Sequence, residues 1–264
     1  MDWNKTKNLF IVVFLVLDIF LVYQFLDYRS AKLKYNKETT SEEQLKADNI
    51  TYPTLPVVTN KENMISGKPK EFNEKDFKAS EGQTISIVNK TTLHSNLSSP
   101  IKLGSGDQKY TELENFMKKD IFAGEKYQKW GKSKDGKKLI YYQVYNGKVL
   151  FNNSHAMIEF TLNENNEVLF YHQTFLEKIE EFKQENQDII PLKAIMSLYS
   201  RGYLPQDSKI TTMELGYYTL IKDIEASQSL VLVPTWHIRV NGEEDYFVNA
   251  IESQVLTIED KLTE

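Results

Sequence analysis

The chain contains no cysteine among its 264 residues. Disulfide bonds, thiolate metal ligands and a cysteine nucleophile are therefore excluded. Histidine is also scarce: the four are His94, His155, His172 and His237, and none lies at the short spacing of a zinc motif. His155 and His172 could approach each other across a hairpin, but two imidazoles without a carboxylate at ligand spacing are more typical of surface residues. We therefore expect no metal site, and no complete motif in the sequence predicts a cofactor or catalytic residues.

Residues 9–26, LFIVVFLVLDIFLVYQFL, lack glycine, alanine, serine and threonine, and Asp18 is their only acidic or basic residue. A helix of this length would be about 27 Å long, close to the hydrocarbon thickness of a bilayer. No A-x-A-like cleavage site follows the run. The sequence therefore predicts a single transmembrane helix that is retained as an anchor; the alternatives are a secretory signal and a buried core helix.

Asp18 is the candidate functional residue of this helix. A carboxylate near the middle of a membrane helix costs about 2.5–3.5 kcal/mol on insertion scales, so such residues usually face protein or water. Helical spacing places apolar neighbours on the same face, and small-residue packing is unavailable. We therefore predict a partner-binding site within the membrane, formed by Asp18, Phe14, Leu15, Leu21, Val22 and Phe25. The alternative is that Asp18 is protonated and simply tolerated in lipid.

Charge is unevenly distributed along the chain. Residues 1–37 carry a net charge of +3 and the remainder carries −8, which gives the formal net charge of −5. An acidic soluble part argues against nucleic acid as a partner. With 41% hydrophobic and 12% aromatic residues, that part has the composition of a globular domain.

The first half of the soluble part is predicted to contain one helix and an antiparallel meander. A polar stalk and loop should occupy residues 27–80, including a short helix with a capping box at Ser41–Gln44 and a loop at 61–78. Thr111–Glu114 resembles a second capping box, and apolar residues at helical spacing continue to Ile121. Alternating patterns and turn residues predict strands at 84–88, 91–97, 127–130, 139–145, 157–162 and 168–175.

The same order of elements recurs after a charged linker at 177–188. Apolar spacing between Leu192 and Tyr199, after Pro191 and before Gly202, predicts a second helix. Strands follow at 209–221, 229–240 and 246–258. We therefore predict an α+β fold: one N-terminal transmembrane helix, then two tandem helix-plus-antiparallel-sheet units. The corresponding domains are a head at 1–8, a membrane helix at 9–26, a stalk and loop at 27–80, and units at 81–176 and 177–264.

One strand of the second unit alternates clearly. Trp236, Ile238 and Val240 should face the core, whereas His237 and Arg239 should face the other way, as in a half-buried antiparallel strand. Trp236 is accordingly predicted to anchor the core and not a ligand site.

Two stretches carry a family resemblance. The N-terminal Met1–Asn8, MDWNKTKN, running into the apolar segment, resembles the start of the YycI family, also called WalI. The C-terminal run VPTWHIRVNG, at 233–242, with YFVNA at 246–250 and Val255-Leu256, again resembles that family and is similar to PepSY-like modules. The resemblance implies a YycH/YycI-like extracellular fold, a cytoplasmic head, and a protein of the cell membrane of low-GC Gram-positive bacteria.

The resemblance also implies the function. YycI proteins are regulatory accessory proteins of the YycFG/WalKR two-component system, and no catalytic residues come with the family. The expected partners are the sensor histidine kinase (YycG/WalK-like), a YycH-like sister protein and the lipid bilayer, in the control of cell-wall metabolism. Two alternatives from other classes stay open: a cell-surface enzyme or envelope-assembly factor acting on wall polymers, and a PepSY-like protease inhibitor.

Overall fold

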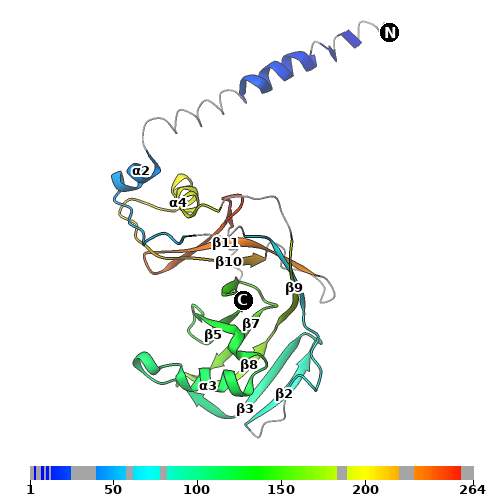
Figure 1. Ribbon diagram of the computed structural model, residues 1–264, viewed down its shortest axis with the longest axis vertical. Helices are drawn as coiled ribbons and strands as arrows, with labels where there is room; N and C mark the ends of the chain where they lie inside the picture. Colours follow the sequence, from blue (N-terminus) through cyan, green and yellow to red (C-terminus); the bar gives the residue numbers. More distant parts are fainter. Residues whose placement is uncertain are drawn as a thin grey trace. The chain divides into compact units, whose positions relative to one another are not determined.

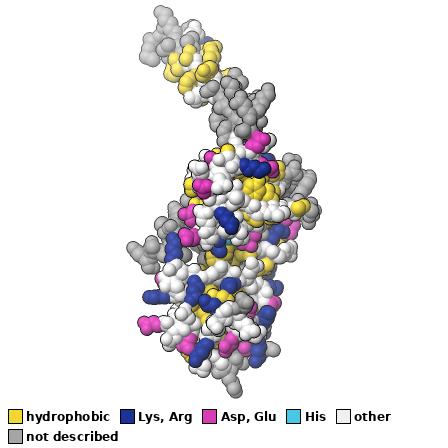
Figure 2. Space-filling view, turned by 90° about the vertical axis from the view of Figure 1, so that its left-hand side faces the viewer, with side chains coloured by type: hydrophobic (Ala, Val, Ile, Leu, Met, Phe, Trp, Pro, Cys, Tyr) yellow, Lys and Arg dark blue, Asp and Glu magenta, His cyan; other side chains and the backbone are white. Residues whose placement is uncertain are grey.

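The computed structural model describes residues 3, 7–8, 10–11, 13–24, 40–57, 62–77, 82–182, 189–219 and 229–256. It divides into two compact units, one formed by residues 1–51 and 204–208, the other by 52–203 and 209–264. Residues 13–24 are helical, and Figure 2 shows hydrophobic side chains covering the described part of this N-terminal helix. Among the described residues, no helix combines the length and the apolarity that a membrane crossing requires.

The smaller unit contains α2 (Ser41–Ala47), whose start is fixed by a capping box. The cap is Thr40 and not Ser41: the Thr40 hydroxyl accepts a hydrogen bond from the Glu43 amide, and the Glu43 carboxylate accepts one from the Thr40 amide. The predicted box was therefore one residue late. After the helix, the chain hydrogen-bonds to segment 204–208, where the Asp207 amide donates to the Asp48 carbonyl and Asn49 donates to the Asp207 carboxylate. Residues 27–39 of the predicted stalk lie outside the described part of the chain.

The larger unit begins with a strand, a hairpin and a helix, followed by the predicted meander (Figure 1). Helix α3 confirms the prediction from apolar spacing, but Thr111 does not cap it, because the N-cap is Tyr110 without a side-chain bond. The elements are β1 (Ile65–Pro69), β2 (Gln83–Val88), β3 (Thr92–Lys102), η1 (Gly106–Gln108), α3 (Thr111–Asp120), η2 (Gly124–Lys126), β4 (Tyr127–Lys132), β5 (Lys138–Tyr145), β6 (Lys148–Phe151), β7 (Met157–Leu162), β8 (Glu167–Gln173) and β9 (Leu176–Glu181).

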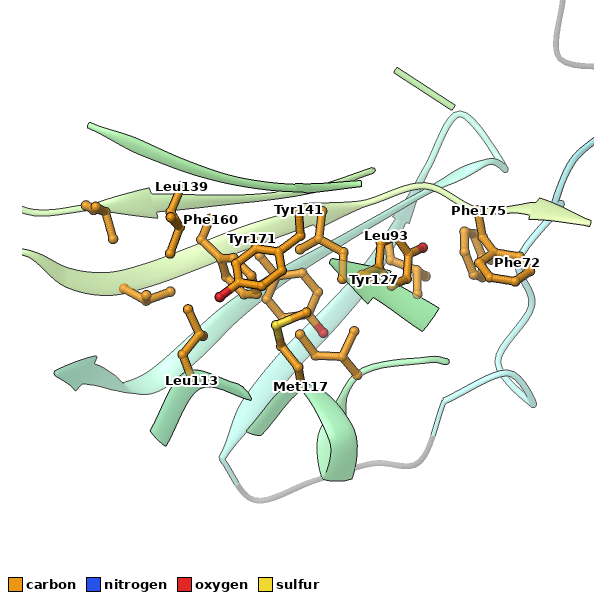
Figure 3. Close-up of a cluster of buried hydrophobic side chains, with 14 residues drawn as sticks. Phe72, Leu93, Leu113, Met117, Tyr127, Leu139, Tyr141, Phe160, Tyr171 and Phe175 are labelled. Atoms are coloured by element: carbon orange, nitrogen blue, oxygen red, sulfur yellow. The ribbon is translucent and has the colours of Figure 1, made fainter. Parts of the chain in front are cut away.

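Helix α3 covers one face of this sheet. Figure 3 shows Leu113 and Met117 pointing from α3 toward Phe160 and Tyr171 on the strands. All four side chains are buried, and they belong to a cluster that also includes Leu93. The large apolar area that these residues bury explains why a helix of only three turns is stable here.

The remaining elements confirm the predicted second helix and its following strands. They are α4 (Pro191–Ser200), β10 (Ile210–Thr219), β11 (Leu230–Val240), β12 (Glu244–Asn249) and β13 (Val255–Leu256). The last two long strands form a hairpin through Asn241 and Gly242, both of which have positive φ. Residues 220–221 and 257–258, at the ends of two predicted strands, lie outside the described residues.

All the strands join in one sheet, with the order β13-β12-β11-β10-β6-β5-β7-β8-β3-β2 along its main path. Strands β10–β13 join the strands of the meander through the pair β6 and β10. These two strands run parallel, with Leu150 opposite Tyr217 and Phe151 opposite Tyr218. The sequence predicted only antiparallel pairs and did not predict β6. The α+β class is confirmed, whereas the division into units at 81–176 and 177–264 stays a prediction.

Two segments predicted as loop and linker are strands. β1 lies inside the predicted loop at 61–78, and β9 covers Leu176 and the first five residues of the predicted charged linker at 177–188. β1 pairs with β9 on one edge and with β11 on the other. The prediction was wrong because β9, LEKIEE, is mostly charged, and its strand conformation depends on backbone hydrogen bonds to a distant partner. Residues 183–188 of the linker lie outside the described residues.

Candidate functional site

The predicted membrane site lies on the N-terminal helix. Asp18 is exposed there, and its four described apolar neighbours, Phe14, Leu15, Leu21 and Val22, are each more than half exposed. A continuous helix places these side chains three or four residues apart on neighbouring turns, so they share one side of the helix. Phe25, the sixth predicted residue, lies outside the described residues, as do residues 9, 12 and 26 of the predicted span. The assignment of this surface to a partner stays a prediction.

The sheet contains a second candidate site, centred on His237, that the sequence did not predict. The imidazole is 2% exposed, and both of its nitrogens have carboxylate partners. Nδ1 lies 2.9 Å from Oε1 of Glu214, and Nε2 lies 2.6 Å from Oδ1 of Asp245. Glu214 stands directly opposite His237 on β10, and Asp245 lies on β12, so three adjacent strands bring the groups together.

Arg239 completes the network. Its Nε donates to Oδ1 of Asp245 at 2.7 Å and its Nη2 donates to Oδ2 at 3.0 Å, which is the bidentate geometry of a strong arginine–carboxylate pair. The two residues face each other across the β11–β12 hairpin. With His237 protonated, two acids balance two bases, and this balance limits the free energy that burying the charges requires.

The network shifts the pKa values of its members. Burial alone would lower the pKa of His237, but hydrogen bonds and charges from Asp245 and Glu214 outweigh burial and raise it. Burial alone would raise the pKa of Asp245, but its bonds to His237 and Arg239 lower it. Both shifts favour the charged forms, so the network is an ion cluster held within the sheet.

An aromatic wall covers His237. Its ring centroid lies 4.8 Å from that of Trp130, 5.4 Å from Phe151 and 5.2 Å from Phe247. Trp130 is the extra residue of a β-bulge in β4, because the register with β5 shifts between Lys129 and Gly131. A bulge of this kind redirects a side chain, and here the indole comes to lie against His237 of another strand.

A small open pocket of about 140 Å³ lies beside this wall, lined by Gln128, Lys129, Trp130, Val149, Thr212, Glu214, His237 and Arg239. Sites for drug-sized ligands usually enclose about 300–1,000 Å³, so this pocket suits a single side chain or a few waters. Because both nitrogens of His237 are engaged by acids, the imidazole is poorly placed to accept a proton from a substrate. The pocket lining contains three basic side chains, Lys129, His237 and Arg239, and one acid, Glu214, so it does not favour a cationic group.

The sequence predicted the two faces of β11 only in part. Trp236, Ile238 and Val240 are buried, as predicted, but His237 is buried too, and Arg239 is about one-third exposed. The half-buried pattern was wrong because β4 and β6 cover the second face with Trp130 and Phe151. The turn signal alone would not have found the pair: a two-residue turn at Asn241-Gly242 would place Arg239 opposite Glu244, whereas the observed connection, residues 241–243, places it opposite Asp245.

The sequence allowed His155 to approach His172 but favoured surface positions for both. His172 lies against His94, with Nδ1 atoms 3.3 Å apart, and not against His155. β3 occupies the position next to β8, which puts His94 directly opposite His172. His155 lies before β7, in the turn that Asn153 stabilises by accepting a hydrogen bond from the His155 amide.

The comparison with protein families shows to which family the chain belongs. The sequence profile described as YycI protein matches residues 30–251. The chain belongs to the YycI family. Membership confirms the family that the two ends of the sequence resemble, although residues 1–8 and 255–256 lie outside the matched range. The matched range begins after residues 9–26, so it does not cover the predicted membrane site of this YycI family protein. No curated protein matches the chain.

Three solved structures are similar to this YycI family protein. A protein from Eubacterium rectale ATCC 33656 has a TM-score of 0.44 and 8% identity, with 80% of this chain and 92% of that chain covered. The C-terminal domain of Bacillus megaterium YpeB has a TM-score of 0.41 and 11% identity, with coverage of 71% and 97%. YycH from Bacillus subtilis has a TM-score of 0.35 and 12% identity, with coverage of 73% and 53%.

Proposed function

We propose that this protein is a regulatory accessory protein that binds and modulates a sensor histidine kinase of the YycFG/WalKR type, together with a YycH-like partner. The observation that carries the proposal is the family match over residues 30–251. In this role the head at 1–8 is cytoplasmic, residues 9–26 cross the membrane once, and the rest of the chain is extracellular. The kinase in such a system controls cell-wall metabolism.

The contact within the membrane is assigned to Asp18 and its apolar neighbours. Asp18 and the apolar side chains on the described part of the helix are exposed, so another helix can contact them. A polar contact in lipid contributes about 1 kcal/mol to helix association. The carboxyl group therefore supplies specificity, and the surrounding apolar side chains keep water away from the bond.

The geometry around His237 supports a binding function over the enzyme alternative. A hydrolase acting on wall polymers needs an acid or base that is free to exchange a proton with its substrate. His237 and Asp245 instead engage each other and neighbouring charged groups. Tight internal pairing is typical of a structural ion cluster.

The decisive experiment is recovery of the kinase with the tagged full-length chain from detergent-solubilised membranes, repeated in cells that lack the YycH-like partner. Asp18→Leu should insert at least as well as the parent but should recover about fivefold less kinase, since about 1 kcal/mol is lost. A matched control is Asp18→Leu combined with Ile19→Asp, which keeps one carboxylate in the helix and moves it about 100° around the helix axis. This double variant should also fail.

Two outcomes separate the parts of the proposal. If the parent recovers no kinase in either strain, kinase binding is wrong. If Asp18→Leu recovers as much kinase as the parent and sustains the same kinase output, the membrane contact is wrong and the extracellular part is the only contact.

A further inference from the structure

Two histidines that are far apart in the sequence stand side by side on the sheet. His94 on β3 lies directly opposite His172 on β8. The two Nδ1 atoms are 3.3 Å apart, and the ring centroids are 4.5 Å apart with an interplanar angle of 41°. A pair of imidazoles at this separation presents two nitrogen donors to the same small volume.

The pair is on the face of these strands that points away from the α3 core. Leu93 and Ser95, which flank His94, are buried, and so are Tyr171 and Gln173, which flank His172. The two histidines themselves are partly exposed. Because side chains alternate along a strand, the imidazoles lie on the opposite face from the core, where an ion can reach them from solvent.

The distance between the nitrogens fits a metal ion. Two imidazole nitrogens at about 2.0–2.1 Å from a tetrahedral zinc ion lie about 3.3–3.4 Å from each other. The ring centroids of two such ligands would be about 5.2 Å apart, so the rings must rotate slightly about χ2, which is a soft torsion. The backbone register does not have to change, because the strands already place the two residues opposite each other.

An acidic side chain lies beside the pair on the next strand. The nearest acid on the same row of the sheet is Glu159, opposite His172 on β7, and its carboxylate is paired with Lys138 at 3.0 Å.

We propose that His94 and His172 form a two-histidine site for a divalent transition-metal ion such as zinc or nickel. Imidazole suits these ions, whereas magnesium and calcium prefer oxygen ligands. In the described part of the chain, no group of three or more His, Cys, Asp or Glu side chains is arranged to hold a metal ion. The site therefore has two protein ligands, with water at the other positions, and binds more weakly than a structural zinc site with four.

The sequence did not predict this site because metal motifs are recognised by short spacings. Here 78 positions separate the two histidines, and only strand pairing joins them. The proposal is independent of the kinase partner, since it concerns a sheet face in the extracellular part.

The test measures metal binding to the purified full-length chain, carrying an affinity tag without histidine. Titration with zinc chloride or nickel chloride in a calorimeter should show one saturable site and a raised melting temperature, and magnesium chloride should show neither. His94→Asn and His172→Asn should each lose the saturable site. His155→Asn is the matched control, because it makes the same change at a half-buried histidine outside the pair, and it should bind as the parent does.

A second measurement needs no variant. Diethyl pyrocarbonate modifies accessible imidazoles, and zinc should protect His94 and His172 from modification, as mapped by mass spectrometry, while His155 is modified equally with and without zinc. Absence of saturable binding by the parent, or unchanged binding by both pair variants, would overturn the proposal. Equal modification of the pair with and without zinc would do the same.

Discussion

The indole of Trp130 lies 4.8 Å from the imidazole of His237, although the two residues come from different halves of the sequence. Arg239 extends over the same indole, with its guanidinium carbon 5.7 Å from the ring centroid. A cation close to an aromatic face is stabilised by the ring quadrupole. This stacking joins the bulged β4 strand to the charged network of β10, β11 and β12, so the two halves share one set of interactions as well as one sheet.

The network predicts a pH dependence of stability. The pKa of His237 is raised in the folded chain, so its contribution is fully present below the unfolded value of about 6.5 and is lost as pH rises through the folded value. The lowered pKa of Asp245 acts at acidic pH, where its contribution to stability is lost as pH falls through the folded value. Urea denaturation between about pH 7.5 and pH 9, above the range in which the lowered pKa values of His155 and His172 act, should therefore show stability falling with rising pH.

His237→Gln isolates this effect, because glutamine keeps hydrogen-bonding groups but does not titrate in this range. The difference in unfolding free energy between parent and variant should shrink as pH rises. Taking this difference cancels the contributions of His155 and His172, which both proteins share and whose lowered pKa values act in the opposite direction. A difference that is constant with pH, or that grows, would show that His237 is neutral in the folded protein.

Trp236 should carry much of the stability of β11. Its side chain is fully buried, so Trp236→Ala should reduce the unfolding free energy of the full-length chain by about 3–5 kcal/mol. Val231→Ala, at an exposed position of the same strand, should change it little. If Trp236→Ala folds with parental stability yet no longer recovers the kinase, Trp236 is an interface residue instead.

A conservative replacement tests the polar atom of the same side chain. Among the described residues, the buried Nε1 of Trp236 has no hydrogen-bond partner. Trp236→Phe removes this unsatisfied donor and deletes less side-chain volume than alanine does. For both reasons it should cost clearly less stability than Trp236→Ala. Equal losses in thermal or urea unfolding would contradict this account.

Gly216 should be required at the junction of β6 and β10. A Cβ atom at this position would overlap the Phe151 ring and the Val149 carbonyl oxygen. Gly216→Ala must push β6 away from β10, with a loss of about 1–3 kcal/mol in unfolding free energy. Gly131→Ala is the matched control, because a Cβ there meets nothing within 4 Å, and it should be tolerated. Equal stability of the two variants would argue against the parallel pairing.

Topology can be tested cleanly because the chain has no cysteine. Ser41→Cys, in the first turn of α2, should react with an impermeant maleimide on intact protoplasts if the chain beyond residue 26 is extracellular. Lys7→Cys, in the predicted cytoplasmic head, should react only after lysis. The reverse pattern would overturn the proposed orientation.

The sequence by itself determined the family, both helices of the larger unit, and most hairpins. Each of these depends on local signals: apolar residues at helical spacing in α3 and α4, and turn residues such as Asn241-Gly242 that tolerate positive φ. Local energetics is enough for such elements, because the interactions that specify them join residues a few positions apart.

Only the tertiary structure decided which distant segments pair. The charged β9 is a strand because its backbone pairs with β1. β6 pairs in parallel with β10, where Gly216 allows the two strands to approach closely. The same long-range pairing buried His237 under Trp130 and brought His94 against His172. These contacts depend on register between strands separated by many residues, and the free energy that selects a register comes from packing and backbone hydrogen bonds that no single segment contains.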